Sequence, residues 1–288
     1  MEASYYPGCS LHGMAVEYDD SVKKVCQALD ITLTELPDWN CCGASSAHFL
    51  DPELAVSLPA RNMLIAEGIG NDVLVPCSAC YQRLKYADKE MKKDPARWAG
   101  GAYEGKAGIL HINEFFDRPE ILIAIKRKVS KPLAGLKCVA YYGCLSQRPP
   151  RITDSGSPEN PESMDRILRA LGVDLKPWSY KTDCCGASLT LTRPDVVRKM
   201  SGDLLEGALE AGAECLVTDC PMCQSNIDTR EEEIGAERGK SYNLPVFYIT
   251  ELMALAFGDR SSSGWWSKHF VNPTALLRHR GLLLDGGD

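Results

Sequence analysis

Ten of the thirteen cysteines fall into a five-cysteine pattern that occurs twice along the 288-residue chain. In each half a single cysteine is followed by an adjacent pair in a Cys-Cys-Gly sequence, and then by two cysteines in a Cys-x-x-Cys sequence. The last four cysteines of the pattern repeat at a constant offset of 143 residues, which indicates an internal duplication. The members are Cys9, Cys41, Cys42, Cys77 and Cys80 in the first half and Cys144, Cys184, Cys185, Cys220 and Cys223 in the second.

Cysteines at these spacings are typical of metal sites. Thirteen cysteines in a reducing compartment point to metal rather than to disulfides. A structural zinc site needs four ligands, whereas each half offers five. Adjacent residues of an extended segment point to opposite sides, so the Cys-Cys pair suits a core of several irons better than one tetrahedral ion. The spacing therefore favours iron–sulfur clusters over zinc.

The composition is that of an acidic globular protein, with 44% hydrophobic and 25% charged residues and a net charge of −7. This charge argues against a nucleic-acid-binding protein, which normally has a basic face. No run of 18 apolar residues occurs, so the sequence predicts no transmembrane helix. The first residues lack the basic start and apolar core of a signal peptide, and we therefore expect a cytoplasmic protein.

Helical and strand patterns alternate around the cysteines. The spacing of apolar residues predicts helices over residues 18–29, 164–171 and 196–208, and β-rich runs predict strands over residues 72–76, 139–142 and 215–219. This alternation predicts the α/β class, with two homologous Rossmann-like α/β repeats related by pseudo-two-fold symmetry. Because functional groups gather at the carboxyl ends of parallel strands, we expect three cysteine-bearing turns per half to meet there.

The duplication predicts the domain organisation. We expect a first cysteine-rich repeat over residues 1–134, a second over residues 135–258 and a short C-terminal tail over residues 259–288. The lead cysteine of the second repeat lies eight residues further from its Cys-Cys pair, which predicts a loop insertion over residues 148–161. The tail is rich in aromatic and apolar residues, and we expect it either to fold back on the body, which we favour, or to dock a partner.

The duplicated arrangement resembles the B-type subunit of heterodisulfide reductase over about 250 residues, nearly the whole chain. The resemblance rests on the lead cysteine, the Cys-Cys-Gly sequence and the Cys-x-x-Cys sequence of each half. It implies that each repeat holds one non-cubane [4Fe-4S] cluster, with all five cysteines of that repeat as ligands. All ten cysteine positions of the family pattern are filled in this sequence.

The resemblance also implies a reaction, the reductive cleavage of a disulfide to two thiols. Disulfide reduction takes two electrons, whereas an iron–sulfur cluster ordinarily passes one at a time, so two clusters facing a shared pocket between the halves would supply them together. The sequence has no ferredoxin-type cysteine run, GxGxxG fingerprint or P-loop. Electrons are therefore expected from partners, which in this family are a ferredoxin-like iron–sulfur subunit of the C type and a flavin-containing subunit of the A type.

Three polar residues near the cysteines are candidates for substrate contact. His12 and His48 follow the lead cysteine and the adjacent pair of the first half, and Arg148 follows the lead cysteine of the second. A histidine beside a cluster is as often a packing residue, and a loop arginine is more often solvated. The cysteines outside the pattern are expected to pack as small hydrophobic residues; they are Cys26, Cys138 and Cys215.

Three other functions are open from the sequence. A sulfur-oxidising relative would run thiol chemistry in the opposite direction, and cluster ligands do not record direction. An iron–sulfur electron-transfer subunit of a glycolate or lactate oxidase-type complex shares the pattern, but such proteins usually carry ferredoxin motifs or act beside a flavin oxidase. A zinc-stabilised interaction protein is disfavoured by the fifth cysteine of each half.

Overall fold

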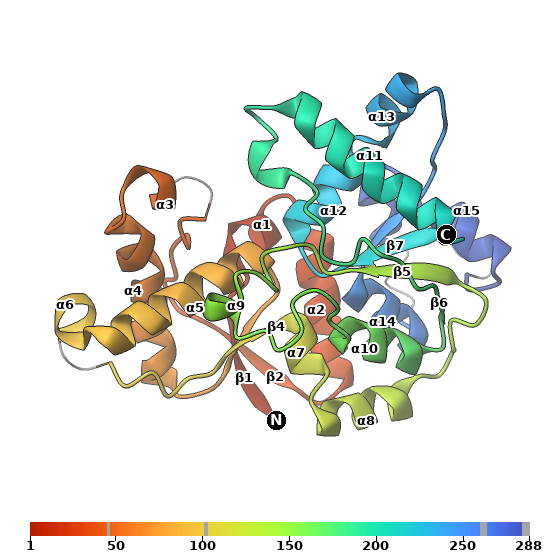
Figure 1. Cartoon of the computed structure of the whole chain (residues 1–288). Coiled ribbons are helices and arrows are strands. Elements are labelled where there is room, and N and C mark those ends of the chain that lie inside the picture. The colour runs from red at the N-terminus through yellow and green to blue at the C-terminus, as the bar shows by residue number, and fades with distance from the viewer. Residues whose placement is uncertain (45–46, 101–102, 260–263, 284–288) are drawn as a thin grey trace.

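The computed structural model describes residues 1–44, 47–100, 103–259 and 264–283. Within these ranges each half of the chain forms a four-stranded sheet in which every strand pair is parallel (Figure 1). The first sheet has the order β2-β1-β3-β4 and contains β1 (Glu2–Tyr5), β2 (Thr32–Glu35), β3 (Val73–Val75) and β4 (Ile109–His111). The second has the order β6-β5-β7-β8 and contains β5 (Lys137–Tyr141), β6 (Asp174–Leu175), β7 (Cys215–Thr218) and β8 (Val246–Tyr248). The predicted pair of homologous α/β repeats is therefore confirmed.

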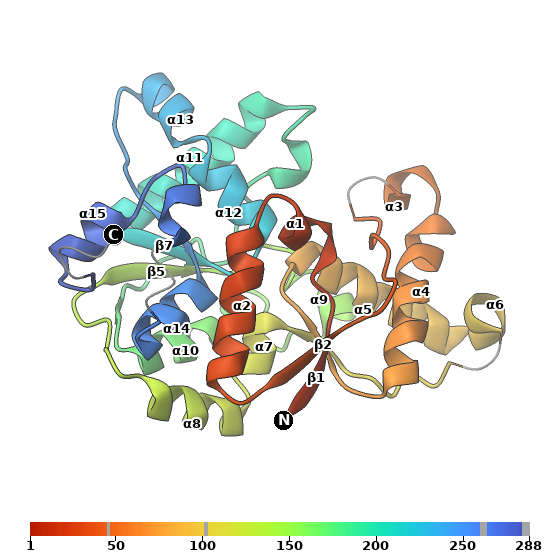
Figure 2. The same ribbon diagram turned by 180° about the vertical axis from the view of Figure 1, so that it is seen from behind.

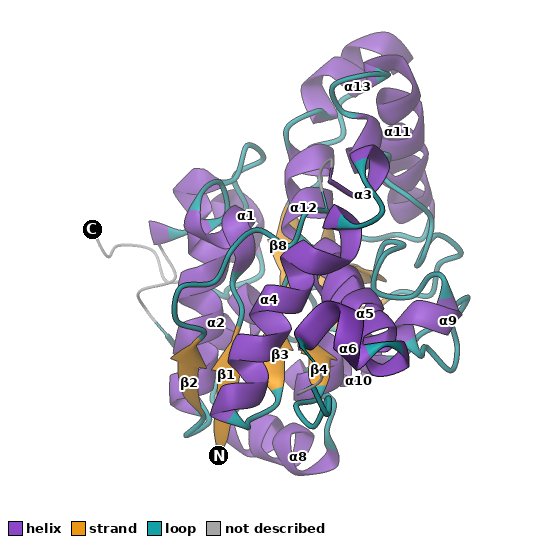
Figure 3. Ribbon diagram, turned by 90° about the vertical axis from the view of Figure 1, so that its left-hand side faces the viewer, coloured by secondary structure: helices purple, strands orange, loops and turns teal. Residues whose placement is uncertain are grey.

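Helices cover both faces of the two sheets. The first half contains α1 (Gly8–His12), α2 (Val16–Ala28), α3 (Ala47–Leu50), α4 (Leu54–Ile69), α5 (Ser78–Lys93), α6 (Pro95–Ala99), α7 (Ile112–Phe116) and α8 (Pro119–Lys128). The second contains α9 (Pro150–Thr153), α10 (Ser163–Leu171), η1 (Ala187–Leu189), α11 (Pro194–Glu210), α12 (Pro221–Asp228), α13 (Glu231–Arg238) and α14 (Ile249–Phe257). The helices predicted over residues 18–29, 164–171 and 196–208 correspond to α2, α10 and α11. Figure 3 shows α4 and α5 in front of the first sheet.

The central strands are apolar because they are covered on both sides. All three residues of β3 and all four of β7 are buried. A strand buried on both faces reads as a continuous apolar run rather than as an alternating pattern, and parallel sheets consist of such strands. The short apolar runs before Cys77 and Cys220 therefore mark the centre of each sheet.

The two repeats share one hydrophobic core. Helix α2 of the first repeat packs against α14 of the second, and the two lie side by side in Figures 1 and 2. The rings of Tyr18 and Tyr248 stack with their centroids 4.0 Å apart, and the hydroxyl oxygens of Ser21 and Thr250 lie 2.6 Å apart. A separate apolar cluster lies within each repeat on the other side of its sheet. The division at residues 134 and 135 stays a prediction, and the core is continuous across it.

The insertion over residues 148–161 joins the repeats instead of extending into solvent as a free loop. It contains α9, which packs against α5 of the first repeat. The Tyr81 hydroxyl of α5 donates to the Thr153 carbonyl at 2.9 Å, and the Gln82 amide donates to the Arg148 carbonyl at 2.9 Å. The additional residues of the second repeat therefore strengthen the contact between the two halves.

The described part of the C-terminal tail folds back on the body, as we expected. It contains η3 (Trp266–Lys268) and α15 (Thr274–His279). Trp265 and Trp266 are buried, and the Trp265 indole donates to the Asp20 carboxylate of α2 at 2.8 Å. His269 lies 2.9 Å from the Glu251 carboxylate in the interior. Residues 260–263 and 284–288 of the predicted tail lie outside the described residues.

Candidate functional site

The cysteines of each half follow neighbouring strands of one sheet. Cys9 lies in α1, close after the end of β1, and Cys77 follows β3 and precedes α5. In the second half Cys144 follows β5, and Cys220 follows β7 and precedes α12. Since β1 is paired with β3 and β5 with β7, the lead cysteine and the Cys-x-x-Cys sequence of each half lie at the carboxyl ends of neighbouring strands, as expected.

Within each half the second cysteine of the adjacent pair meets the last cysteine of the Cys-x-x-Cys sequence. The Sγ atoms of Cys42 and Cys80 lie 3.3 Å apart, and those of Cys185 and Cys223 lie 3.6 Å apart. The first cysteine of each pair accepts a hydrogen bond from the backbone amide of the glycine in the same Cys-Cys-Gly sequence, at 3.4 Å in the first half and 3.3 Å in the second. The two sites therefore match in these contacts, although Cys9 and Cys41 are exposed and Cys144 and Cys184 are partly buried.

The thiols of each half lie close enough to shift the pKa of one another. Hydrogen bonds from Cys41 and Cys80 lower the pKa of Cys42 well below its ordinary value. In the second half a hydrogen bond from Cys144 lowers the pKa of Cys184 to about 6. Both halves therefore favour a thiolate, which is the form of cysteine that binds a metal.

Cys77 and Cys220 bring the two sites together across the boundary between the repeats. The two thiols lie close enough to shift the pKa of each other: Cys220 raises the pKa of Cys77, and Cys77 contributes to the lowered pKa of Cys220. The Tyr18 hydroxyl donates to the Asp219 carbonyl at 2.9 Å and lies 3.5 Å from the Pro76 carbonyl. These carbonyls belong to the residues just before Cys220 and Cys77, so Tyr18 holds the two Cys-x-x-Cys turns side by side.

Tyr18→Phe is expected to lower the free energy of unfolding by about 1–2 kcal/mol, because it leaves a buried carbonyl without its donor. The side chain of Tyr18 is fully buried, so water cannot replace the lost hydroxyl without a rearrangement. The measurement is the unfolding transition of the intact chain in denaturant, with Tyr86→Phe as the matched control on the partly exposed face of α5. Equal transitions for the two variants would contradict the role of Tyr18.

A buried polar network surrounds the same contact. The Asp219 carboxylate of the second repeat accepts hydrogen bonds from Ser78 at 3.3 Å and from Asn113, both in the first repeat. Ser78 in turn lies 3.2 Å from Nε2 of His111. Burial raises the pKa of Asp219 and lowers the pKa of His111 to about 4. Nδ1 of His111 lies 3.8 Å from the Asp219 carboxylate, but burial favours the neutral form of both groups.

Glycine precedes the lead cysteine in both halves, and the sulfur atoms explain why. Gly8 and Gly143 have positive φ angles of 69° and 63°. A Cβ atom on Gly8 would lie 2.9 Å from Sγ of Cys80, and one on Gly143 would lie 3.0 Å from Sγ of Cys223. The absence of a side chain at these positions leaves the thiols the space that they occupy.

Gly8→Ala is expected to reduce the metal content of the first half, because the methyl group would displace the Cys80 thiol. The matched control is Gly70→Ala, which introduces the same left-handed strain at a φ angle of 86° but meets no atom within 4 Å. Metal analysis of the two purified variants is the measurement. Equal losses would assign the effect to backbone strain instead of to crowding of the sulfur.

Two tyrosines that the sequence analysis did not single out support the Cys-Cys-Gly turns. The Tyr6 hydroxyl donates to the Asn40 carbonyl at 2.8 Å, and the Tyr141 hydroxyl donates to the Asp183 carbonyl at 2.8 Å. Each of these carbonyls belongs to the residue just before an adjacent cysteine pair. The signal in the sequence is a tyrosine three residues before each lead cysteine.

The two candidate histidines have neighbours of their own in the first repeat. Nε2 of His12 lies 3.2 Å from the Glu35 carboxylate, and its ring packs edge-on against Trp39. His48 lies in α3 with its ring centroid 3.9 Å from that of the exposed Phe49, and its Nδ1 atom has no hydrogen-bond partner among the described residues. Their roles in substrate contact stay predictions.

Arg148 contacts the segment just before Cys184 and Cys185. Its guanidinium forms an ion pair with Glu159 and donates to the hydroxyl of Thr182 at 3.0 Å. Thr182 precedes Cys184 by two residues, so Arg148 fastens the insertion to this turn. A contact between Arg148 and substrate stays a prediction as well.

The cysteines outside the pattern pack in the interior, as predicted. Cys26, Cys138 and Cys215 all belong to the core that the two repeats share. Burial raises the pKa of Cys26 to about 12. A thiol with so high a pKa is neutral at physiological pH and behaves as a small hydrophobic side chain.

Comparison with known proteins identifies the family of the chain. The profile of the cysteine-rich domain named CCG matches residues 3–85 and again residues 138–228. Together these two ranges take in more than half of the chain. The protein belongs to the CCG cysteine-rich family. Each matched range takes in the first three strands of one sheet and ends before the fourth, β4 or β8, and the two ranges contain all ten cysteines of the pattern.

Several relatives of this CCG protein align along most of their length. It is 31% identical to the 8-methylmenaquinol:fumarate reductase membrane anchor subunit of Wolinella succinogenes, over 96% of this chain and 99% of that protein. It is 29% identical to the B-type subunit of the ferredoxin:CoB-CoM heterodisulfide reductase of Methanosarcina mazei, over 88% of this chain and 89% of that protein. A weaker relative is a lactate utilization protein of Bacillus cereus, at 23% identity over 88% of this chain and 98% of that protein. The resemblance to the B-type subunit of heterodisulfide reductase is thereby confirmed.

One solved structure shares the fold of the CCG protein. It is the crystal structure of a hypothetical protein from Helicobacter pylori, with a TM-score of 0.72 and 11% sequence identity. The match covers 94% of this chain but only 52% of the other, so this chain spans about half the length of that one. In the described ranges of the CCG protein, no helix is both long enough and apolar enough to cross a membrane.

The donor set of each CCG domain fits an iron–sulfur cluster. It consists of five thiols, two of which are adjacent in the chain and therefore suited to different irons of one inorganic core. Glycine stands where a side chain would crowd the sulfurs, and three of the ten thiols, Cys42, Cys184 and Cys220, have lowered pKa values. No three His, Cys, Asp or Glu side chains in the described part of the chain are placed to hold one metal ion.

Proposed function

We propose that this chain is the catalytic iron–sulfur subunit of a heterodisulfide reductase-type complex. In this proposal the five pattern cysteines of each repeat hold one [4Fe-4S] cluster of the non-cubane type. The clusters, when bound, would supply one-electron transfer at iron. The observation that most supports the proposal is the Tyr18 hydroxyl, which lies 2.9 Å from the Asp219 carbonyl and 3.5 Å from the Pro76 carbonyl and so makes the turns of Cys220 and Cys77 neighbours.

The proposed reaction is RSSR′ + 2e⁻ + 2H⁺ → RSH + R′SH. It breaks one sulfur–sulfur bond and needs two electrons, which two adjacent one-electron sites are suited to deliver together. The buried contacts of Tyr18 and Asp219 fix the distance between the two Cys-x-x-Cys turns, so a disulfide at the boundary would find both sites in constant positions. The proposed substrate contacts are the three polar residues that follow pattern cysteines in the chain, His12, His48 and Arg148.

The electrons would come from partner proteins. We propose a ferredoxin-like iron–sulfur subunit and a flavin-containing subunit, since two of the relatives carry subunit names and the M. mazei relative is named for ferredoxin. We also propose a cytoplasmic location, in keeping with thirteen cysteines that are all free thiols.

The anaerobically purified chain is expected to contain about eight irons, four for each repeat, with spectra unlike those of cubane clusters. The reason is the fifth thiol of each site, since a cubane cluster takes four. Iron, zinc and sulfide analysis of the same sample is the measurement. Stoichiometric zinc with negligible iron would rule out the proposed cofactor.

The reaction itself is tested on the chain produced together with its partner subunits. The assay supplies reduced ferredoxin and the CoB-CoM heterodisulfide, followed by other small disulfides. The expected result is the release of two thiols for each disulfide consumed. If the clusters are reduced but no disulfide is cleaved, the proposed reaction is wrong.

A second candidate function is favoured by the relative from W. succinogenes. Its 31% identity extends over 99% of its length, and it is named as a subunit of a quinol:fumarate reductase. In this alternative the chain would pass electrons between a quinol and a partner enzyme. Reduction of fumarate by menaquinol in the same purified complex, without cleavage of any disulfide, would favour the second candidate over the first.

A further inference from the structure

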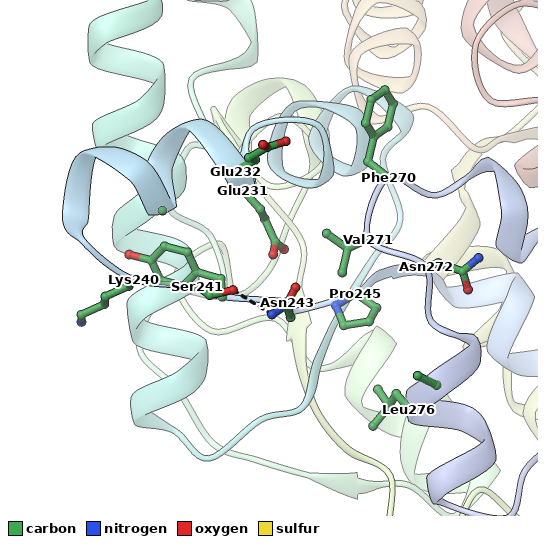
Figure 4. Close-up of a pocket in the computed structure, with 13 residues that line it drawn as sticks. Glu231, Glu232, Lys240, Ser241, Asn243, Pro245, Phe270, Val271, Asn272 and Leu276 are labelled. Atoms are coloured by element: carbon green, nitrogen blue, oxygen red, sulfur yellow. Dashed lines mark hydrogen bonds between the residues drawn. The ribbon is translucent and has the colours of Figure 1, made fainter.

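A cavity of about 560 Å³ lies between α13, the segment before β8 and the C-terminal tail. Figure 4 shows the carboxyl group of Glu231 pointing into the space that Asn243, Pro245 and Val271 border, with Leu276 below. None of the ten pattern cysteines lines this cavity. It is therefore separate from the proposed catalytic site.

Glu231 is an acidic side chain with half of its hydrogen-bonding capacity unused. The residue is 5% exposed, and its Oε2 atom accepts a hydrogen bond from the Leu244 amide at 3.0 Å. Its Oε1 atom is buried and has no hydrogen-bond partner within the described ranges. A buried acceptor without a donor costs free energy unless a ligand or a water molecule donates a hydrogen bond to it.

The basic residue of the cavity lining does not form an ion pair with Glu231. Lys240, the basic residue in the cavity lining, forms an ion pair with Glu206 at 2.7 Å, and Figure 4 shows its side chain pointing away from Glu231. The nearby Asp228 carboxylate accepts hydrogen bonds from the amides of Phe270 and Val271. Burial and the charge of Asp228 raise the pKa of Glu231 to about 8. A cation in the cavity would offset the burial of Glu231 and its repulsion by Asp228, and would therefore favour the ionised carboxylate.

Part of the lining near the carboxyl group is aliphatic. Pro245, Val271 and Leu276 belong to the apolar part of a lining that also contains the polar residues Ser241, Asn243 and Asn272. A cavity with a buried acid and an apolar section of wall matches a ligand with a positive head and a short hydrocarbon chain. The head would pair with Oε1 in a charge-assisted hydrogen bond, and the chain would cover the apolar wall.

We propose that this cavity is a binding site for a primary ammonium group on a short aliphatic chain, with Glu231 as its acceptor. A free alkylamine and a lysine side chain offer the same chemistry. The site does not depend on the proposed redox function, because it shares no residue with the cysteine sites. Failure of one proposal therefore leaves the other standing.

The test is titration calorimetry of the full chain as purified, whatever its metal content, with n-butylammonium and, as a neutral probe of the same shape, n-butanol. We expect n-butylammonium to bind at least about tenfold more tightly, which is the effect of a hydrogen bond to a charged group. Nα-acetyl-lysine methylamide distinguishes the second source of the ligand. Binding of either ammonium supports the site, and equal binding of n-butylammonium and n-butanol, or of neither, overturns it.

Glu231→Gln is the variant that isolates the carboxylate. Its amide oxygen can still accept from the Leu244 amide, so the fold is expected to survive, and the affinity for n-butylammonium should fall about tenfold. The matched control is Glu232→Gln, which removes the same charge from the next residue of the lining. Equal losses for the two variants would overturn the assignment of Glu231, and the calorimetric comparison on the unaltered chain decides the question even if a variant misfolds.

Discussion

Cys185→Ala is expected to abolish disulfide reduction while the first repeat keeps its cluster. We expect turnover to fall by about 100-fold or more, since changing even a residue that only supports a metal ligand costs about 10- to 100-fold. Cys185 contacts Cys223 of its own repeat at 3.6 Å and takes no part in the contact between Cys77 and Cys220. The variant therefore removes one site without disturbing the boundary between the two.

The measurement combines iron content, the reducibility of the remaining cluster and the rate of thiol release with a cleavable disulfide. Cys138→Ala is the matched control, because Cys138 belongs to the same repeat but lies in the shared core. Near-normal turnover of Cys185→Ala would reduce the second site to an electron relay or a structural remnant. Loss of turnover with an intact, reducible first site would support the joint action of both.

Cys42→Ala is expected to remove about half of the iron, that of the first repeat alone. Cys42 lies 3.3 Å from Cys80 and has a pKa well below that of an ordinary thiol, so its loss deprives the first site of a thiolate. The second site has its own five thiols, and Cys42 is not among the residues that cross the boundary. Iron and sulfide analysis of the purified variant is the measurement.

The control for this experiment is Cys26→Ala in the same repeat. Cys26 is buried in the shared core, and we expect its replacement to cost on the order of 1 kcal/mol of stability with no loss of iron. If Cys26→Ala loses iron as severely as Cys42→Ala, the assignment of the ligands is wrong. A loss of all iron from Cys42→Ala would show that the two sites depend on each other.

The shared core holds the two repeats in a fixed position relative to each other. Two repeats with separate cores could move relative to each other, but α2 and α14 pack together, and α9 of the second repeat packs on α5 of the first. Tyr18 adds a hydrogen bond that ties the first repeat to the turn before Cys220. The two cysteine sites are therefore held in a constant relation, which suits a reaction that needs both.

The sequence by itself determined the repeats, the parallel α/β class and the ten cysteines of the pattern. Each of these has a local signal: a constant offset of 143 residues, an apolar run before each Cys-x-x-Cys sequence, and helical spacing over residues 18–29 and 164–171. Such signals depend on residues that are near one another in the chain. The structure has the corresponding elements at β3, β7, α2 and α10.

Only the tertiary structure decided how the halves meet. The carboxylate of Asp219 bonds to Ser78 across 141 positions of sequence, and the hydroxyl of Tyr18 bonds to the carbonyl of Asp219 across 201. Asp219 has no equivalent in the first repeat, where Pro76 stands in its place, so the internal symmetry gave no indication of these contacts. Periodicity reports that a face is buried but not which surface buries it. That choice depends on the packing of the whole chain.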